Sequence, residues 1–277
     1  FINGSSSKIG GSRQILNSLI EKISKYGDKE DYKYIILVPN IAEFKHIKKK
    51  HIVFKQIPET LNKTFLVPVN SLFLIPSIIK KSNIDIVFNL GDIPLKTSIK
   101  QIMLFDWPYA IYDDPLVWKL MSKKEFISRK IKLIIFKYLI KNVDMMLAQT
   151  SVAKIRLLDR YKDIKKINIF PNAVATDHFK ISSISEHDDK ISNKFNLLCL
   201  SAYYAHKNLE VFIETGKILR DKNIPAKIFL TIDPGQNKNA KKLIKKIYQE
   251  EIDSQIVNLG SIQLSDVPSL YRRVDAL

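Results

Sequence analysis

The chain has 277 residues, enough for one large domain or two ordinary ones, and 45% of them are hydrophobic, which is sufficient for a buried core. Its formal net charge of +17 brings nucleic acid, anionic lipid and polyanionic substrates into consideration as partners. The basic residues are spread thinly, and the short run Lys45–Lys50 is interrupted by His46 and Ile47. A solvated basic surface is therefore the simpler explanation of the charge.

Cysteine content and hydropathy limit the compartment. Cys199 is the single cysteine, so no disulfide can form within the chain and a reducing, cytoplasmic compartment fits; its apolar surroundings predict a small buried side chain. No apolar run reaches the roughly 18 residues of a membrane-spanning helix. Phe1 enters directly on a turn and Val274–Leu277 resembles the start of a strand, so we expect a fragment of a longer protein.

The first part of the chain alternates short apolar runs with amphipathic segments. The apolar runs predict strands that end near residue 3 and lie at Tyr34–Val38, Val53–Ile57, Ile84–Asn89, Gln101–Phe105, Val143–Ala148 and Ile167–Phe170. The amphipathic segments predict helices after Gly10-Gly11 and at Leu72–Lys81, Lys119–Lys141 and Val152–Tyr161. On the long helix, we expect one buried stripe formed by Ile127, Ile131, Ile134, Ile135, Tyr138 and Leu139. Such alternation predicts a parallel sheet with right-handed crossovers.

A polar, Ser- and Asp-rich stretch then interrupts the rhythm, and a second α/β series follows. Its predicted strands are Asn196–Leu200, Ala226–Ile232 and Ile256–Leu259, and its predicted helices are Leu209–Arg220, Asn239–Glu250 and Val267–Arg272. We therefore expect a first domain at residues 1–180, a linker or surface loop at 181–194, and a second, partial domain at 195–277.

The stretch Leu197–Asn208 joins a strand to a helix through a polar loop that carries Lys207. Helix N-terminal amides and a nearby ammonium group both attract anions, so this junction suits a phosphate or diphosphate. Gly10 and Gly11 precede the first helix, where glycine permits close approach of a ligand to the backbone. A plain tight turn at the glycines and a surface lysine near a helix start are the alternatives.

Several kinds of chemistry lack their motifs. The sequence has no G-x-G-x-x-G after a strand, no P-loop and no G-x-S-x-G nucleophile elbow. Its five histidines show no metal-ligand spacing, and no zinc finger or RNP-like aromatic motif occurs. We expect no metal, no cofactor and no nucleic-acid partner.

Four stretches, taken together, carry a family resemblance. They are Gly10-Gly11 before a helix, Val143-Asp144-Met145-Met146-Leu147-Ala148-Gln149-Thr150-Ser151, Ile169-Phe170-Pro171-Asn172-Ala173-Val174, and Leu200-Ser201-Ala202-Tyr203-Tyr204-Ala205-His206-Lys207-Asn208-Leu209. In this order the chain resembles the retaining glycosyltransferases of family 4 (group 1). The resemblance implies an α/β fold of the GT-B type, with two Rossmann-like parallel-sheet domains facing a cleft and the second domain incomplete here.

The resemblance also implies site residues. Donor binding falls on Gly10, Gly11, Lys207 and Asn208, and contacts to the acceptor or to sugars on Asp106, Trp107, Tyr109 and Asn172. In place of the arginine that often precedes the family's lysine, this chain has Ser201-Ala202, and in "P-N-G-V" it has Ala173 for glycine. Where the family commonly has a histidine, the chain has Phe105-Asp106-Trp107. An aromatic loop with a purely structural role is as open an interpretation of these residues as sugar contact.

The resemblance implies a hexosyltransferase that moves a sugar from a nucleotide-sugar donor to a saccharide or lipid-linked acceptor in surface polysaccharide or glycoconjugate synthesis, with retention. Peripheral contact with the inner face of a membrane is compatible with it. The family's E-x7-E glutamates would lie beyond Leu277, so we expect the fragment alone to be inactive. The alternatives are a non-catalytic GT-B-like binding protein, or a membrane-surface or nucleic-acid-binding protein driven by charge.

Overall fold

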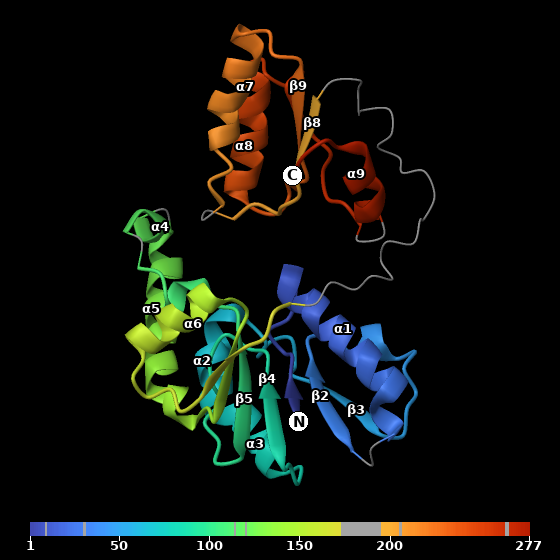
Figure 1. Cartoon of the computed structure of the whole chain (residues 1–277), viewed down its shortest axis with the longest axis vertical. Coiled ribbons are helices and arrows are strands. Elements are labelled where there is room, and N and C mark those ends of the chain that lie inside the picture. Colours follow the sequence, from blue (N-terminus) through green and yellow to red (C-terminus); the bar gives the residue numbers. More distant parts are fainter. Residues whose placement is uncertain are drawn as a thin grey trace. The chain divides into compact units, whose positions relative to one another are not determined.

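The computed structural model describes residues 1–8, 10–29, 32–113, 115–119, 121–172, 195–204, 207–263 and 266–277. The chain divides into two compact units, Phe1–Val174 and Ala175–Leu277, and each contains one parallel sheet with helices packed on it (Figure 1). The predicted linker at 181–194 and the predicted boundary at residue 180 lie outside the described residues.

The first unit is built on a sheet of seven strands, all parallel, in the order β3-β2-β1-β4-β5-β6-β7. The strands are β1 (Ile2–Asn3), β2 (Tyr34–Val38), β3 (Ile52–Gln56), β4 (Ile86–Asn89), β5 (Lys100–Phe105), β6 (Met145–Ala148) and β7 (Ile167–Ile169). The predicted strands are confirmed to within two residues. The order runs outward in both directions from β1 and β4, which makes this a doubly wound sheet.

Helices cover both faces of this sheet because successive side chains of its strands point in opposite directions. Ile36 and Val38 of β2 pack with helix α1 (Gly10–Tyr26), whereas Leu37 between them packs with α3 (Ile75–Lys80). Helices α5 (Lys123–Leu139) and α6 (Ser151–Arg160) pack on the same face as α3, at the β5, β6 and β7 end. The remaining helices of this unit are the short α2 (Val67–Val69) and α4 (Pro115–Lys119).

Pro76 affects the predicted helix at Leu72–Lys81. The structure has a π-helical turn, Asn70–Leu74, directly before α3, and Pro76 lies in the first turn of α3. A proline removes one backbone donor and its ring crowds the preceding turn, so the widened turn before it is the expected accommodation. Pro76 therefore lies at the boundary between the π-helical turn and α3.

The long predicted helix Lys119–Lys141 is instead two helices, and its predicted buried stripe is wrong. Ser122 caps α5, because its hydroxyl accepts a hydrogen bond from the Glu125 amide at 3.2 Å. Four residues of the predicted stripe are exposed, namely Ile127, Ile131, Ile134 and Tyr138. The buried face of α5 consists of Lys132, Phe136 and Leu139.

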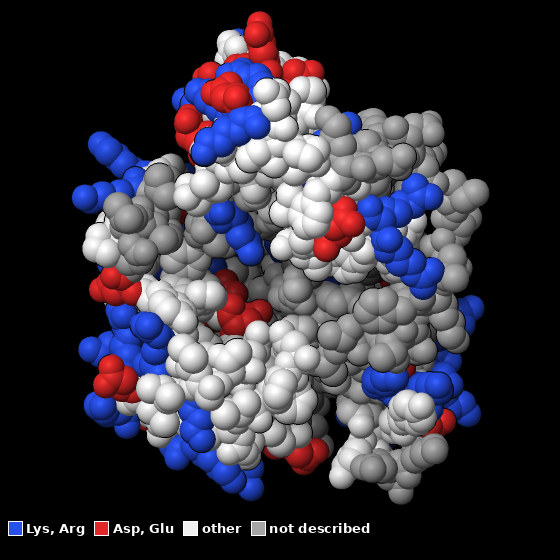
Figure 2. Space-filling view, turned by 45° about the horizontal axis from the view of Figure 1, so that its top comes forward, with Lys and Arg blue, Asp and Glu red and all other residues white. Residues whose placement is uncertain are grey.

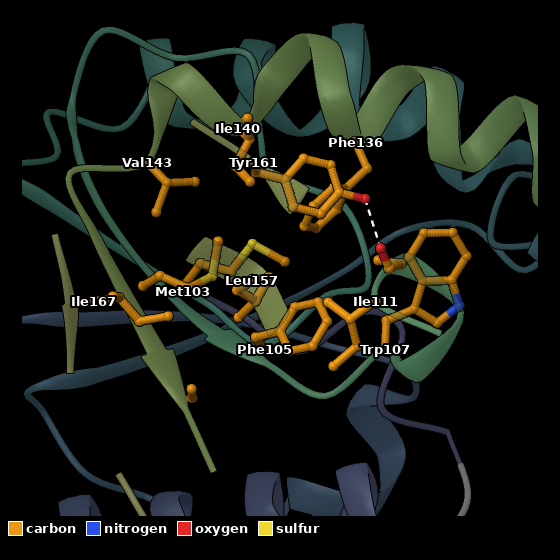
Figure 3. Packing of buried hydrophobic residues seen from close by; sticks show 13 residues of the cluster. Met103, Phe105, Trp107, Ile111, Phe136, Ile140, Val143, Leu157, Tyr161 and Ile167 are labelled. Atoms are coloured by element: carbon orange, nitrogen blue, oxygen red, sulfur yellow. Dashed lines mark hydrogen bonds between the residues drawn. The ribbon is translucent and has the colours of Figure 1, made fainter. Parts of the chain in front are cut away.

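The reason lies in the packing around Phe136 (Figure 3). Its ring has edge contacts with Phe105 at 6.0 Å and Tyr161 at 5.2 Å between centroids, and a tilted contact with Trp107 at 6.1 Å. The Tyr161 hydroxyl donates a hydrogen bond to the Ala110 carbonyl at 2.7 Å, drawn as the dashed line. These aromatic contacts turn Phe136 toward the sheet and therefore turn the isoleucine stripe away from it.

The second unit has a three-stranded parallel sheet in the order β10-β9-β8. Its elements are β8 (Phe195–Cys199), α7 (Val211–Asp221), β9 (Ala226–Leu230), α8 (Lys238–Gln249), β10 (Ile256–Asn258) and α9 (Val267–Arg273). Ala276 forms a parallel bridge with Leu197 on the free side of β8, where the sequence predicted that a strand begins. The order thus repeats that of β3-β2-β1-β4 in the first unit.

In the described part of the chain, no helix is both long enough and apolar enough to pass through a lipid bilayer.

Candidate functional site

The strand order locates a candidate site in each unit. In open parallel sheets, ligands bind beyond the carboxyl ends of the strands, at the point where the strand order reverses. In the first unit that point lies between β1 and β4, and in the second between β8 and the bridge formed by Ala276. The loops that leave β1 and β8 are therefore the candidate ligand-binding loops.

Two buried asparagines hold the reversal point of the first sheet together. The side-chain amide of Asn3, at the end of β1, donates a hydrogen bond to the side-chain oxygen of Asn89, at the end of β4, at 2.8 Å. Asn3 also accepts from the Ser5 hydroxyl at 2.8 Å, and Asn89 accepts from the Gly91 amide at 3.0 Å. This network fixes the first residues of both loops, so the crevice between them is formed in advance of any ligand.

The loop from β1 to α1 has the properties of an anion site. A Cβ on Gly4 would lie 2.6 Å from a δ-methyl group of Leu16 in α1, so a larger residue there would displace this buried side chain. The Ser7 hydroxyl is buried and has no hydrogen-bond partner among the described residues. Gly10 opens α1 with a φ of +67°, and a Cβ on Gly10 or Gly11 would meet no described atom within 4 Å. Among the described residues, none crowds the first turn of α1 at these glycines.

Charged residues follow β4 and β5 on the same edge. Lys132 of α5 is only 5% exposed, and its ammonium group forms an ion pair with Asp92 at 2.8 Å. Burial and the nearby Asp92 carboxylate raise the pKa of Asp106 to about 7, and a hydrogen bond from its own backbone amide opposes this rise. Asp106 therefore holds or releases a proton near neutral pH, which is the property of a group that binds hydroxyls or transfers protons.

The aromatic residues after β5 are part of the hydrophobic core. Trp107 is 5% exposed and packs on Phe136. The Tyr109 ring lies under the Arg129 guanidinium at 3.9 Å and contacts Trp118 at 5.8 Å; burial raises the pKa of its hydroxyl, with the Arg129 charge opposing. This placement favours the structural role over stacking on a sugar, because both rings already have packing partners.

Asn172 lies beyond the end of β7, exposed. Its side-chain amide donates to the side-chain oxygen of Gln149, which follows β6, at 2.9 Å. The two residues belong to two of the stretches that carry the family resemblance, and the structure brings them together at the carboxyl edge of the sheet. Ala173, the next residue of the same stretch, lies outside the described residues.

In the second unit, the predicted strand, loop and helix are found around Lys207. Lys207 is exposed, its backbone amide donates to the Tyr204 carbonyl at 2.9 Å, and Asn208 follows with a φ of +49°. Burial raises the pKa of the Cys199 thiol at the end of β8, and the Lys207 ammonium opposes this rise. The positive charge of Lys207 therefore acts electrostatically on a group at the carboxyl end of β8. Cys199 itself is half-buried, less enclosed than predicted.

Neighbouring loops brace this one. Gln236 makes two hydrogen bonds with the backbone of Tyr203, accepting from its amide at 2.9 Å and donating to its carbonyl at 2.8 Å. The Tyr203 hydroxyl donates a hydrogen bond to the Glu210 carboxylate. Burial raises the pKa of Tyr203 to about 12, with this hydrogen bond as the second cause. The loops after β8 and β9 are thereby tied together at Tyr203, four residues before Lys207. His206 lies outside the described residues.

Sequence reasoning missed the pair formed by Asp92 and Lys132. Asp92 lies shortly after a predicted strand, but Lys132 lies 40 residues after Asp92, on a helix whose buried face was wrongly predicted. In the part of the chain that the structure describes, no group of three or more histidine, cysteine or acidic side chains could hold a metal ion. On the face shown in Figure 2, lysine and arginine side chains lie in several separate groups among acidic and uncharged residues.

No protein-family model and no curated protein sequence matches this chain. Solved structures do. A glycosyltransferase from Rickettsia africae is 22% identical, with a TM-score of 0.57 over 92% of this chain and 66% of that one. Sucrose-phosphate synthase from Thermosynechococcus elongatus is 10% identical, with a TM-score of 0.66 over 99% of this chain and 73% of that one. Anabaena HepE, in complex with UDP and glucose, is 14% identical, with a TM-score of 0.61 over 99% of this chain and 71% of that one.

These structural neighbours are GT-B glycosyltransferases, and the likeness shows that the chain has this α/β fold. The predicted fold class is confirmed. The chain spans 66% of the length of the Rickettsia protein and somewhat more of the other two. At these identities the likeness shows the fold alone and does not establish the activity.

Proposed function

We propose that this chain belongs to a retaining glycosyltransferase of family 4, which moves a hexose from a nucleotide-sugar donor to a saccharide or lipid-linked acceptor. The observation that carries the proposal is the position of Lys207, on a braced loop at the carboxyl end of β8, where the strand order of the second sheet reverses. The complex of HepE with UDP and glucose, in a protein of the same fold, supports a nucleotide-sugar as the donor.

In this proposal, Lys207 and Asn208 bind the donor diphosphate. A charge-assisted hydrogen bond from the Lys207 ammonium contributes about 1.5–3 kcal/mol. Negative charge grows on the diphosphate as the bond to the sugar breaks, so a cation fixed at this place stabilises the transition state more than the ground state. In this proposal, the Lys207 ammonium performs the electrostatic task that a divalent metal has in other transferases.

The first unit binds the acceptor in this proposal. Gly10 and Gly11 leave a helix N-terminus open to a ligand, and Asp106, at the end of β5, binds sugar hydroxyls. Asn172 and Gln149 mark the acceptor side of the same edge. Acceptors of surface polysaccharide or glycoconjugate synthesis suit this arrangement, and the single cysteine suits a cytoplasmic enzyme.

Calorimetric titration with a panel of nucleoside diphosphates tests the proposal. Lys207→Ala should weaken binding of the preferred diphosphate by about ten- to a hundredfold, since a charge-assisted contact is lost. Lys222→Ala is the matched control, because Lys222 is an exposed lysine at the opposite end of α7. Equal affinities of the two variants would show that the diphosphate binds elsewhere. Binding without sugar transfer from any donor by the full-length protein would favour the non-catalytic alternative.

A further inference from the structure

Helix α5 carries an apolar surface that the described residues leave uncovered. Ile127, Ile131, Ile134 and Tyr138 recur at intervals of four, three and four residues and so share one face of the helix; they are exposed by 58, 46, 68 and 54%. We call these four residues the α5 stripe. Single exposed apolar residues are ordinary on protein surfaces, but an aligned row along three turns marks an interaction site.

A row of lysines runs beside the α5 stripe. Lys123, Lys130 and Lys137 of α5 are spaced by seven residues each, which places them along one side of the α5 stripe, and Lys141 follows in the 3-10 turn Ile140–Asn142. We call them the α5 lysine row. The Lys141 ammonium lies 4.9 Å from the centre of the Tyr138 ring, and that of Lys130 lies 4.2 Å from the Trp118 ring. Their aliphatic stems thus follow apolar surface while the charges remain at the water boundary.

Acidic residues do not balance these charges on α5. The helix has six cationic residues and one acidic residue, Glu125, which is paired with Arg129 at 2.7 Å. Lys132 is buried and paired with Asp92, so the other four cations of α5 have no ion pair among the described residues. A second copy of the chain on the same face would bring two lysine rows together, which like-charge repulsion opposes. A nucleic-acid backbone would satisfy the lysines but not the isoleucines. A surface that presents anionic groups directly beside apolar chains satisfies both.

We propose that the α5 stripe and the α5 lysine row seat this chain on a lipid bilayer that contains anionic lipid. The helix lies in the plane of the interface, with the isoleucines in the acyl boundary and the lysines among the headgroups. Tyr138 suits the same boundary, since its ring is apolar and its hydroxyl polar. The neighbouring helix α2 contacts α5, and Phe65, Val69 and Phe73 on and around α2 are also exposed.

Co-sedimentation with vesicles tests this inference directly. The chain should bind vesicles of phosphatidylserine and phosphatidylcholine in equal parts, bind pure phosphatidylcholine far more weakly, and lose binding as salt is raised. The double variant Ile131→Ser with Ile134→Ser should lower the partition coefficient about tenfold or more. The double variant Lys123→Gln with Lys137→Gln should lower it roughly ten- to thirtyfold on the anionic vesicles.

Matched controls distinguish binding through α5 from nonspecific binding of exposed isoleucines and lysines to vesicles. Ile218→Ser with Ile224→Ser removes two isoleucines that are similarly exposed, by 51 and 42%, in the second unit. Lys241→Gln with Lys245→Gln removes two exposed lysines of α8. Both controls should bind as the unaltered chain does. A separate reporter, Tyr138→Trp, should show a blue shift of its fluorescence on adding anionic vesicles, because the indole enters a less polar environment.

The inference does not depend on the proposed function, and the experiments keep the two apart. The isoleucine variant should retain the nucleoside diphosphate affinity and the melting temperature of the unaltered chain, because the α5 stripe is exposed and lies outside the candidate site. Failure to bind anionic vesicles, or equal loss in the variants and their controls, would overturn the inference. So would a dimer in sedimentation equilibrium that the isoleucine variant abolishes, since a second copy would then be the occupant.

Discussion

The protonation of Asp106 makes stability depend on pH in a way that the structure specifies. The pKa of this carboxyl is about 7, against an ordinary value of 3.8, because burial and the Asp92 carboxylate disfavour its charged form. Between these two values the folded chain holds a proton that the unfolded chain has released. The contribution of Asp106 to the free energy of unfolding is therefore greatest below about pH 4, and it is lost as pH rises to about 7.

The size of the effect follows from the difference in pKa. A shift of about three units corresponds to roughly 4 kcal/mol, and the part of the carboxyl that water reaches lowers this to about 2–4 kcal/mol. The variant Asp106→Asn resembles the protonated side chain at every pH. Its free energy of unfolding, relative to that of the unaltered chain, should therefore rise by about 2–4 kcal/mol between about pH 4 and pH 8.

Urea unfolding of both proteins across this pH range measures the difference. Other titrating groups contribute equally to both chains and cancel in the comparison. Asp253→Asn, at an exposed aspartate, measures what the removal of a surface carboxylate does by itself. A difference for Asp106→Asn that stays constant with pH, or shrinks as pH rises, would refute the reasoning that burial keeps this carboxyl protonated.

Two further predictions concern buried polar groups. Asp92→Ala should lower the free energy of unfolding by about 3–5 kcal/mol, because it leaves the buried Lys132 ammonium unpaired, whereas Lys132→Met should cost only about 1 kcal/mol. Equal costs in urea unfolding would contradict this asymmetry. Tyr161→Phe should lower the free energy of unfolding by about 1–3 kcal/mol, because a buried hydrogen bond is lost. Tyr248→Phe, at an exposed tyrosine, should lower it by about 0.5 kcal/mol or less. Similar melting temperatures of the two variants would argue against that bond.

The strands could be predicted because both faces of each sheet are enclosed. Strands in such sheets are short apolar runs, and a run such as Tyr34–Val38 is readable without knowing its neighbours. The helices that follow were located by the periodicity of their apolar residues. Fold class follows from the alternation of these elements, so the confirmed part of the prediction needed only local information.

Helix α5 shows where local information fails. Its apolar residues exceed what one face can hold, so periodicity alone does not determine which of them are buried. The aromatic contacts of Phe136 with Phe105 and Tyr161 decide the matter, and these residues are far apart in the sequence. The same rotation of the helix buries Lys132, which no pattern of apolar residues predicts.

The candidate site divides in the same way. The loop around Lys207 is a contiguous stretch, so a strand, a cation and a helix start could be recognised there. The pairing of Asp92 with Lys132, and the contact between Asn3 and Asn89, depend on which strands are neighbours in the sheet. Strand order is a property of the whole fold, and only the structure reveals it.

The most direct test of the central claim maps the nucleotide site. Amide resonances of the isotopically labelled chain would be followed by NMR while the preferred nucleoside diphosphate is added. The account predicts the largest shifts in the loop after β8 and at the start of α7, around Tyr203, Lys207 and Asn208. Shifts confined to the opposite end of α7, around Lys222 and Asn223, or an absence of shifts at saturating ligand, would contradict it.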